Sequence, residues 1–159
     1  MTKVKVVEGK ATAIKADALI AAINPTGLWV GGLHEEIKKS SGNLFHSQAL
    51  AAMPLQKGQV VFASCMISHG GNYGSVIFVV DDSLSVYEVV TMALNTAIKN
   101  KIARVSVPTF DADIDDLVQL AKAIADFKSS TPSTTIKEII VVVSNEDDKY
   151  ILDDELWLV

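Results

Sequence analysis

The chain has 159 residues, 49% of them hydrophobic, and a formal net charge of −5, a profile typical of a globular protein with a full apolar core. The acidic balance argues against a general affinity for nucleic acid or for an anionic membrane. The single cysteine, Cys65, excludes an intramolecular disulfide, and no run approaches the ~20 apolar residues needed to span a bilayer. We therefore expect one soluble domain over residues 1–159, located in the cytoplasm.

Strands and short helices are expected in the first third of the chain. Residues 3–7 read as a strand, residues 11–15 leave room for one helical turn, and Ala18–Ile23 is apolar throughout. A run of this length is too short for a lone buried helix and is typical of a central strand covered on both faces. Apolar residues at helical spacing then predict two short helices that break at residues 40–42 and end before Pro54.

The remaining elements alternate between strands and helices. Residues 59–67 and Ser75–Val80 are strand-like and compatible with an antiparallel pair. The further expectations are a helix from residues 81–83 to about 99, a strand at 103–107, a long helix after 109–116, a polar linker at 129–135, a strand at 139–143, a charged turn at 145–149 and an extended piece at 155–159. Ile114 and Val118 are placed on the buried stripe of the long helix. This alternation predicts an α/β protein, a three-layer α/β/α sandwich with a mixed central sheet.

The loop after the first buried strand is the first candidate site. Asn24 stands where the strand ends, Gly31 and Gly32 follow, and a helix begins at Leu33. Free backbone N–H groups and the helix dipole favour an anion or a polar ligand at such a loop. Asn24 can hydrogen-bond ribose hydroxyls through both its carbonyl and its amide, or it can simply cap the turn.

Several short motifs, in this order and spacing, resemble a macro domain over about residues 6–143. The stretches that carry the resemblance are Gly9-Lys10-Ala11-Thr12, similar to the family's Gly-Asp-Ile-Thr start, Ala21-Ala22-Ile23-Asn24, similar to Asn-Ala-Ala-Asn, Gly31-Gly32-Leu33, similar to the glycine run, Lys57-Gly58-Gln59-Val60, similar to Thr-Gly-Glu-Ala, and Ser106-Val107-Pro108, similar to the Phe-Pro strand end. The family typically binds ADP-ribose, and some members hydrolyse its derivatives.

The resemblance implies a ligand-binding set and a partner. The ligand-binding positions it implies are Lys10, Ala11, Ala22, Asn24, Gly31, Gly32, Leu33, Pro108, Thr109, Phe110 and Asp111. The implied partner is an ADP-ribose-like small molecule or an ADP-ribosylated protein. If the chain is a hydrolase of ADP-ribosyl groups, Asn24 orients the ribose and His34 activates water. No cofactor and no metal is expected.

Departures from the family pattern favour an alternative, a degenerate macro-like scaffold that acts through protein contacts. Lys10 replaces the acid that pairs with the adenine amino group, and His34 replaces the acid that activates water. The second phosphate loop, residues 109–113, lacks glycine and carries two acids. Open alternatives remain for individual residues: the aspartates of residues 111–116 cap a helix or hold a cation, Phe110 stacks on a ligand or packs in the core, and Trp29 is a lid or a plug.

Overall fold

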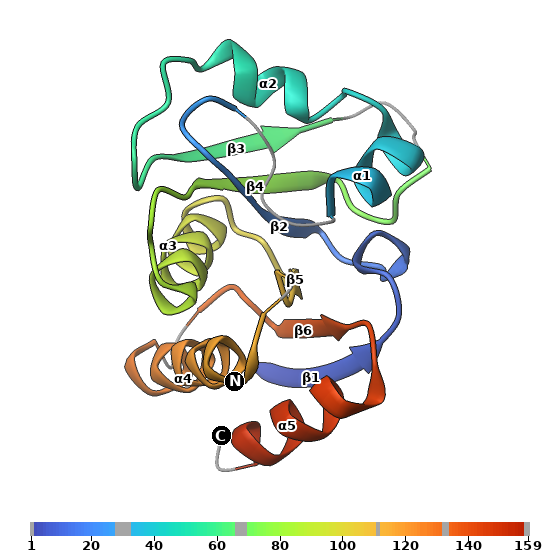
Figure 1. The fold of residues 1–159 in the computed structure, drawn as a ribbon, viewed down its shortest axis with the longest axis vertical. Coiled ribbons are helices and arrows are strands. Elements are labelled where there is room, and N and C mark those ends of the chain that lie inside the picture. The colour runs from blue at the N-terminus through green and yellow to red at the C-terminus, as the bar shows by residue number, and fades with distance from the viewer. Residues whose placement is uncertain (1, 28–32, 66–69, 111, 132–133, 158–159) are drawn as a thin grey trace.

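The protein forms one six-stranded mixed sheet with helices on both faces (Figure 1). The structure, a computed structural model, describes residues 2–27, 33–65, 70–110, 112–131 and 134–157. The strands are β1 (Lys3–Glu8), β2 (Ala18–Ile23), β3 (Val60–Ser64), β4 (Ser75–Val80), β5 (Arg104–Pro108) and β6 (Glu138–Val143). The helices are η1 (Ala11–Ala13), α1 (Leu33–Ser41), α2 (His46–Ala51), α3 (Val86–Lys99), α4 (Ile114–Ser130) and α5 (Glu146–Leu156).

The strand order is β1-β6-β5-β2-β4-β3. The strands pair in parallel except for β3, which runs antiparallel to β4, so the predicted antiparallel pair is confirmed. Every residue of β2 and of β4 is buried, because both strands lie inside the sheet and both of its faces are covered.

Two apolar layers cover the sheet. On one face the core contains residues of α3, α4 and α5, and on the other face it contains residues of α1 and α2. The α/β/α sandwich with a mixed sheet is therefore confirmed. None of the helices in the described part of the chain has the length and hydrophobicity of a membrane-spanning segment.

The C-terminal segment differs from the prediction. Residues 146–156 form helix α5 instead of a charged turn followed by an extended piece. The acids interpreted as a turn are a helix start: Asn145 accepts a hydrogen bond from the N–H of Asp148 (2.8 Å), and three acids in the first turn complement the helix dipole. Leu152 is fully buried and fixes the helix to the core.

Four other expectations are corrected. Helix α3 starts at Val86 rather than at residues 81–83, because Ser85 and Glu88 form a capping box there. On α4, Ile114 and Val118 are exposed rather than buried, and the apolar stripe begins at Leu117. Helix α4 also continues to Ser130, into the expected linker, and β3 ends at Ser64 rather than at residue 67.

The capping interpretation of the aspartates is right for Asp113, which accepts from the N–H of Asp116 (2.9 Å).

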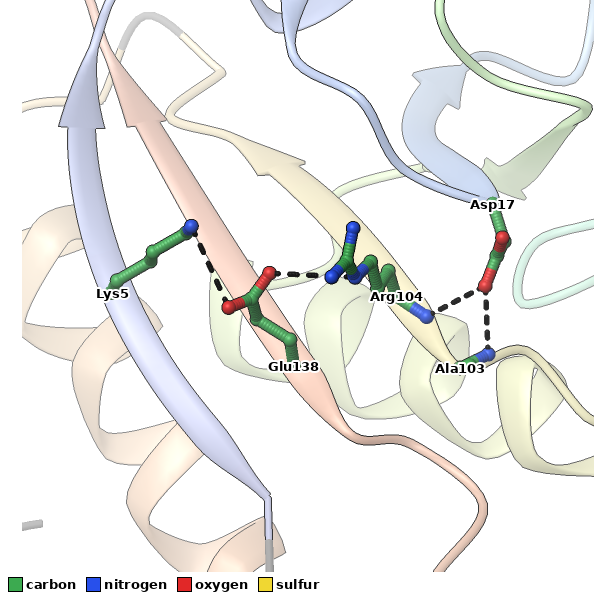
Figure 2. A network of polar contacts seen from close by, with 5 residues as sticks. All are labelled: Lys5, Asp17, Ala103, Arg104 and Glu138. Carbon is green, nitrogen blue, oxygen red and sulfur yellow. Dashed lines mark hydrogen bonds and ion pairs between the residues drawn. The ribbon is translucent and has the colours of Figure 1, made fainter.

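Asp17 joins the amino ends of three strands, and Figure 2 shows its contacts with the start of β5. Its Oδ2 accepts from the N–H groups of Ala103 (3.1 Å) and Arg104 (2.9 Å) at the start of β5, and its carbonyl oxygen accepts from the N–H of Ser75 (3.1 Å) at the start of β4. On the other side of Arg104, the Glu138 carboxylate bridges to Nε of Arg104 (3.8 Å) and to Nζ of Lys5 (3.5 Å). Charged groups thus align the strands at the edge where they begin.

Replacing Asp17 with alanine should lower the free energy of unfolding by about 1–2 kcal/mol, because two N–H groups at the start of β5 lose a charged acceptor. Urea denaturation monitored by circular dichroism measures the change. The matched control is Asp82→Ala, which removes an exposed aspartate and should stay within about 0.5 kcal/mol of the parent. Equal stability of the two variants would contradict the role given to Asp17.

Candidate functional site

The sheet opens between β2 and β5 at the carboxyl ends of these strands. These strands pair only at Ala18 with Val105 and at Leu19 with Ser106, whereas β2 stays paired with β4 up to Ile23. Strand β5 likewise stays paired with β6 up to Pro108. The chain leaves β2 toward β4 and leaves β5 toward β6, so this opening is the topological switch point, where open α/β sheets bind ligands.

Asn24 follows β2 directly at this opening, and both its side-chain and its main-chain carbonyl oxygens accept hydrogen bonds within the turn. Oδ1 accepts hydrogen bonds from the N–H and from the hydroxyl of Thr26, and the carbonyl oxygen of Asn24 accepts from the N–H of Gly27 (2.9 Å). The Asn24 side chain therefore caps this turn. Because both lone pairs of Oδ1 are used, a contact of this side chain with a ligand has to come from its amide donor.

A histidine that the sequence did not suggest holds the same turn. Nε2 of His46 on α2 lies 2.8 Å from the carbonyl oxygen of Gly27, so this nitrogen donates to it. Gly27 has φ of +84°, and a Cβ there would lie 2.7 Å from Cδ2 of Leu50. Positions 27 and 46 show no pattern that links them along the sequence, so only the folded arrangement of the turn against α2 reveals the contact.

The second loop begins where β5 ends. Pro108 is the last residue of β5, the carbonyl oxygen of Thr109 accepts from the N–H of Ala112 (3.0 Å), and Phe110 has φ of +55°. Phe110 is half-buried and packs against the core on the α3 and α4 face. It also lines a cavity of about 80 Å³ whose other walls are Ala22, Asp81, Leu84, Val86 and Val89.

Lys10 lies in a separate groove of about 210 Å³ beside α1, which is also lined by Thr12, Glu35, Glu36, Lys39 and Ser40. Two carboxylates of α1, those of Glu35 and Glu36, therefore border the same groove as Lys10, which replaces the acid of the macro-domain pattern. Ala11 and Leu33, two other predicted ligand-binding residues, are buried in the core on this face of the sheet.

Gly31, Gly32, Asp111 and Trp29 lie outside the described residues, and so does the side chain of His34, which stands in the first turn of α1. In the described ranges, no three His, Cys, Asp or Glu side chains gather where they could hold a metal ion.

No protein-family model matches the sequence, and no curated protein matches it. Solved structures match the fold over nearly the whole chain. A Trypanosoma brucei macrodomain in complex with ADP superposes with a TM-score of 0.80 and 14% identity, covering 97% of this chain and 69% of that one. An Oceanobacillus iheyensis macrodomain mutant with ADPR gives a TM-score of 0.76 and 16% identity, covering 98% and 92%.

The macro domain of ganglioside induced differentiation associated protein 2 is similar at a TM-score of 0.79 and 14% identity, covering 97% of this chain and 84% of that one. At these identities the likeness concerns the fold. The chain therefore has the macrodomain fold.

Proposed function

We propose that this protein binds ADP-ribose or a related nucleotide at the carboxyl edge of its sheet, across the opening between β2 and β5. The observation that carries the proposal is the likeness, over 97% and 98% of this chain, to macrodomains solved with ADP and with ADPR. The chain's own geometry supports it, because Ala22 and Phe110 line a cavity at the switch point, and Asn24 and Pro108 lie at the ends of the two strands that part there.

The ligand spans more than one cavity in this proposal. The cavity of about 80 Å³ at Phe110 and the groove of about 210 Å³ at Lys10 are each smaller than the roughly 300–1,000 Å³ of a typical ligand pocket. In this proposal a molecule with two ring systems joined by a diphosphate places one ring system in each. The ribose end lies toward Asn24 and Phe110, and the adenine end lies toward Lys10.

Adenine recognition in this proposal uses the acids of α1. The exocyclic amine of adenine is a donor and needs an acceptor, which Lys10 does not supply. Glu35 and Glu36 border the groove that contains Lys10, so a carboxylate is available there from a different element. Lys10 then acts on the anionic part of the ligand rather than on the base.

Hydrolysis is the narrower version of the proposal. His34 accepts a proton from a water molecule, whose oxygen attacks the anomeric carbon of the ribose as the bond to the modified side chain breaks. Binding alone requires fewer groups, and it remains the primary proposal. The test measures release of ADP-ribose from a mono-ADP-ribosylated protein. Loss of this release in His34→Ala, with ADP-ribose affinity retained, would support the hydrolytic version. Equal release rates in the parent and in His34→Ala would reject it.

Replacing Asn24 with aspartate should weaken ADP-ribose binding by about tenfold or more, which is ~1.4 kcal/mol. The aspartate keeps an acceptor for Thr26 and so keeps the turn, but it removes the amide donor and adds a negative charge beside the ligand. Calorimetric titration measures both proteins. Asn100→Asp, at the end of α3, is the control and should bind as the parent does.

A parent protein that gives no heat with ADP-ribose, ADP or NAD at millimolar concentration would contradict the proposal. That result would favour the scaffold alternative, in which the half-buried Phe110 closes the former site.

The double variant Glu35→Gln/Glu36→Gln should lose the preference for adenine over hypoxanthine. Hypoxanthine presents an acceptor where adenine has its amine, so a carboxylate in the groove should disfavour an inosine analogue of ADP-ribose. We expect the parent to prefer ADP-ribose by about fivefold or more and the variant by less than about twofold. Competition binding with the two ligands measures this ratio, with Asp115→Asn as the control. A ratio that is unchanged in the double variant would place the base elsewhere.

A further inference from the structure

Helix α5 carries the whole net charge of the protein. Six of its eleven residues are acidic and one, Lys149, is basic, so the helix has a net charge of −5. The complete chain also has a net charge of −5, so its other residues hold equal numbers of acidic and basic side chains. The acidity is thus a property of one helix, which packs beside β1 and α4 at the margin of the fold (Figure 1).

The same helix is apolar on two opposite faces. Leu152 is fully buried, and Ile151 and Leu156 pack with it against the core. On the outer face Tyr150 is 75% exposed, and Trp157, which directly follows the helix with helical backbone angles, is 81% exposed. These two aromatic residues are seven positions apart, almost two helical turns, and therefore lie one above the other along the helix. An exposed tryptophan aligned with an exposed tyrosine is unusual for a surface that contacts only water.

Acidic side chains surround the two rings. Glu146 lies four residues before Tyr150, and Asp153 and Asp154 lie three and four residues after it, so all three share its face of the helix. All three are exposed, and Asp153 also pairs with Nζ of Lys149 (2.6 Å). The outer face of α5 is therefore a short aromatic strip with carboxylates on both sides.

We propose that the outer face of α5, formed by Tyr150, Trp157, Glu146, Asp153 and Asp154, docks a basic, arginine-containing segment of a partner protein. A guanidinium group can stack on an indole or phenol ring and donate to a carboxylate at the same time, and this face offers both partners within one or two helical turns. The acidic border repels anionic membranes, nucleic acid and the same face of a second copy. Charge complementarity thus selects a basic protein segment among the possible occupants.

This surface is independent of the nucleotide proposal. None of its residues lines the opening between β2 and β5 or the groove at Lys10, so the failure of either proposal leaves the other standing. It also differs from the other exposed apolar residues of the described chain. Ile114 and Val118 on α4 are exposed too, but neither is aromatic, and they supply a matched control surface.

The test uses the full chain and a synthetic peptide with six arginines separated by glycine and serine, in low-salt buffer. The matched probe is the same peptide with citrulline in place of arginine, which keeps the shape and removes the charge. We expect calorimetry to show binding of the arginine peptide that weakens about tenfold or more with citrulline or at 0.5 M salt. Tyr150→Ser/Trp157→Ser should weaken it by about fivefold or more, and Ile114→Ser/Val118→Ser should not.

A second comparison separates the aromatic and acidic contributions. Glu146→Gln/Asp154→Asn should weaken binding of the arginine peptide, whereas Asp115→Asn on α4 should leave it unchanged. Equal affinity for the arginine and citrulline peptides, or an aromatic double variant that binds like the parent, would overturn the proposal. So would sedimentation data showing that the parent dimerises and that Tyr150→Ser/Trp157→Ser does not, because the occupant would then be a second copy of this chain.

Discussion

The candidate site depends on how β2 and β5 are joined. Asp17 binds two N–H groups at the start of β5. Pairing between β2 and β5 then ends at Leu19 and Ser106. Each strand continues to pair with its other neighbour, so the sheet is closed at the edge where strands begin and open at the edge where they end. The two strands are thus anchored to each other at one end, and the chain leaves them in opposite directions at the other.

The sequence predicts the parts of this arrangement that rest on continuous apolar runs. β2 and β4 are recognisable because all their residues are apolar or small, and burial on both faces permits nothing else. The start of α1 at Leu33 is also predictable, because apolar residues at helical spacing begin there. The three-layer order follows from the alternation of such runs with amphipathic ones.

The sequence does not predict what local charge and distant contacts decide. Acids at residues 146–148 are compatible with a turn or with a helix start, and only the burial of Leu152 against the core selects the helix. The contact between His46 and Gly27 joins positions that no periodicity relates. Phe110 takes a left-handed backbone conformation in a loop without glycine, and no propensity would place it there.

At two positions, Asn24 and Lys10, the residue type alone does not predict the role that we propose. Asn24 caps its own turn through Oδ1, and in our proposal the amide nitrogen of the same side chain contacts the ligand. Lys10 replaces an acid, yet Glu35 and Glu36 border the same groove from α1. In our proposal the acceptor has moved from one element to a neighbouring one, and the macrodomain fold keeps its ligand while it changes the residues that hold it.

The most direct measurement is a titration of the ¹⁵N-labelled protein with ADP-ribose, followed by amide chemical shifts. We expect the largest shifts at the ends of β2 and β5, in Ala22, Asn24, Thr109 and Phe110, with smaller shifts at Lys10 and Glu36. Amides of α5 should not move. Shifts confined to α5 or to the edge where the strands begin, or no shifts at millimolar ligand, would contradict a nucleotide site at the opening between β2 and β5.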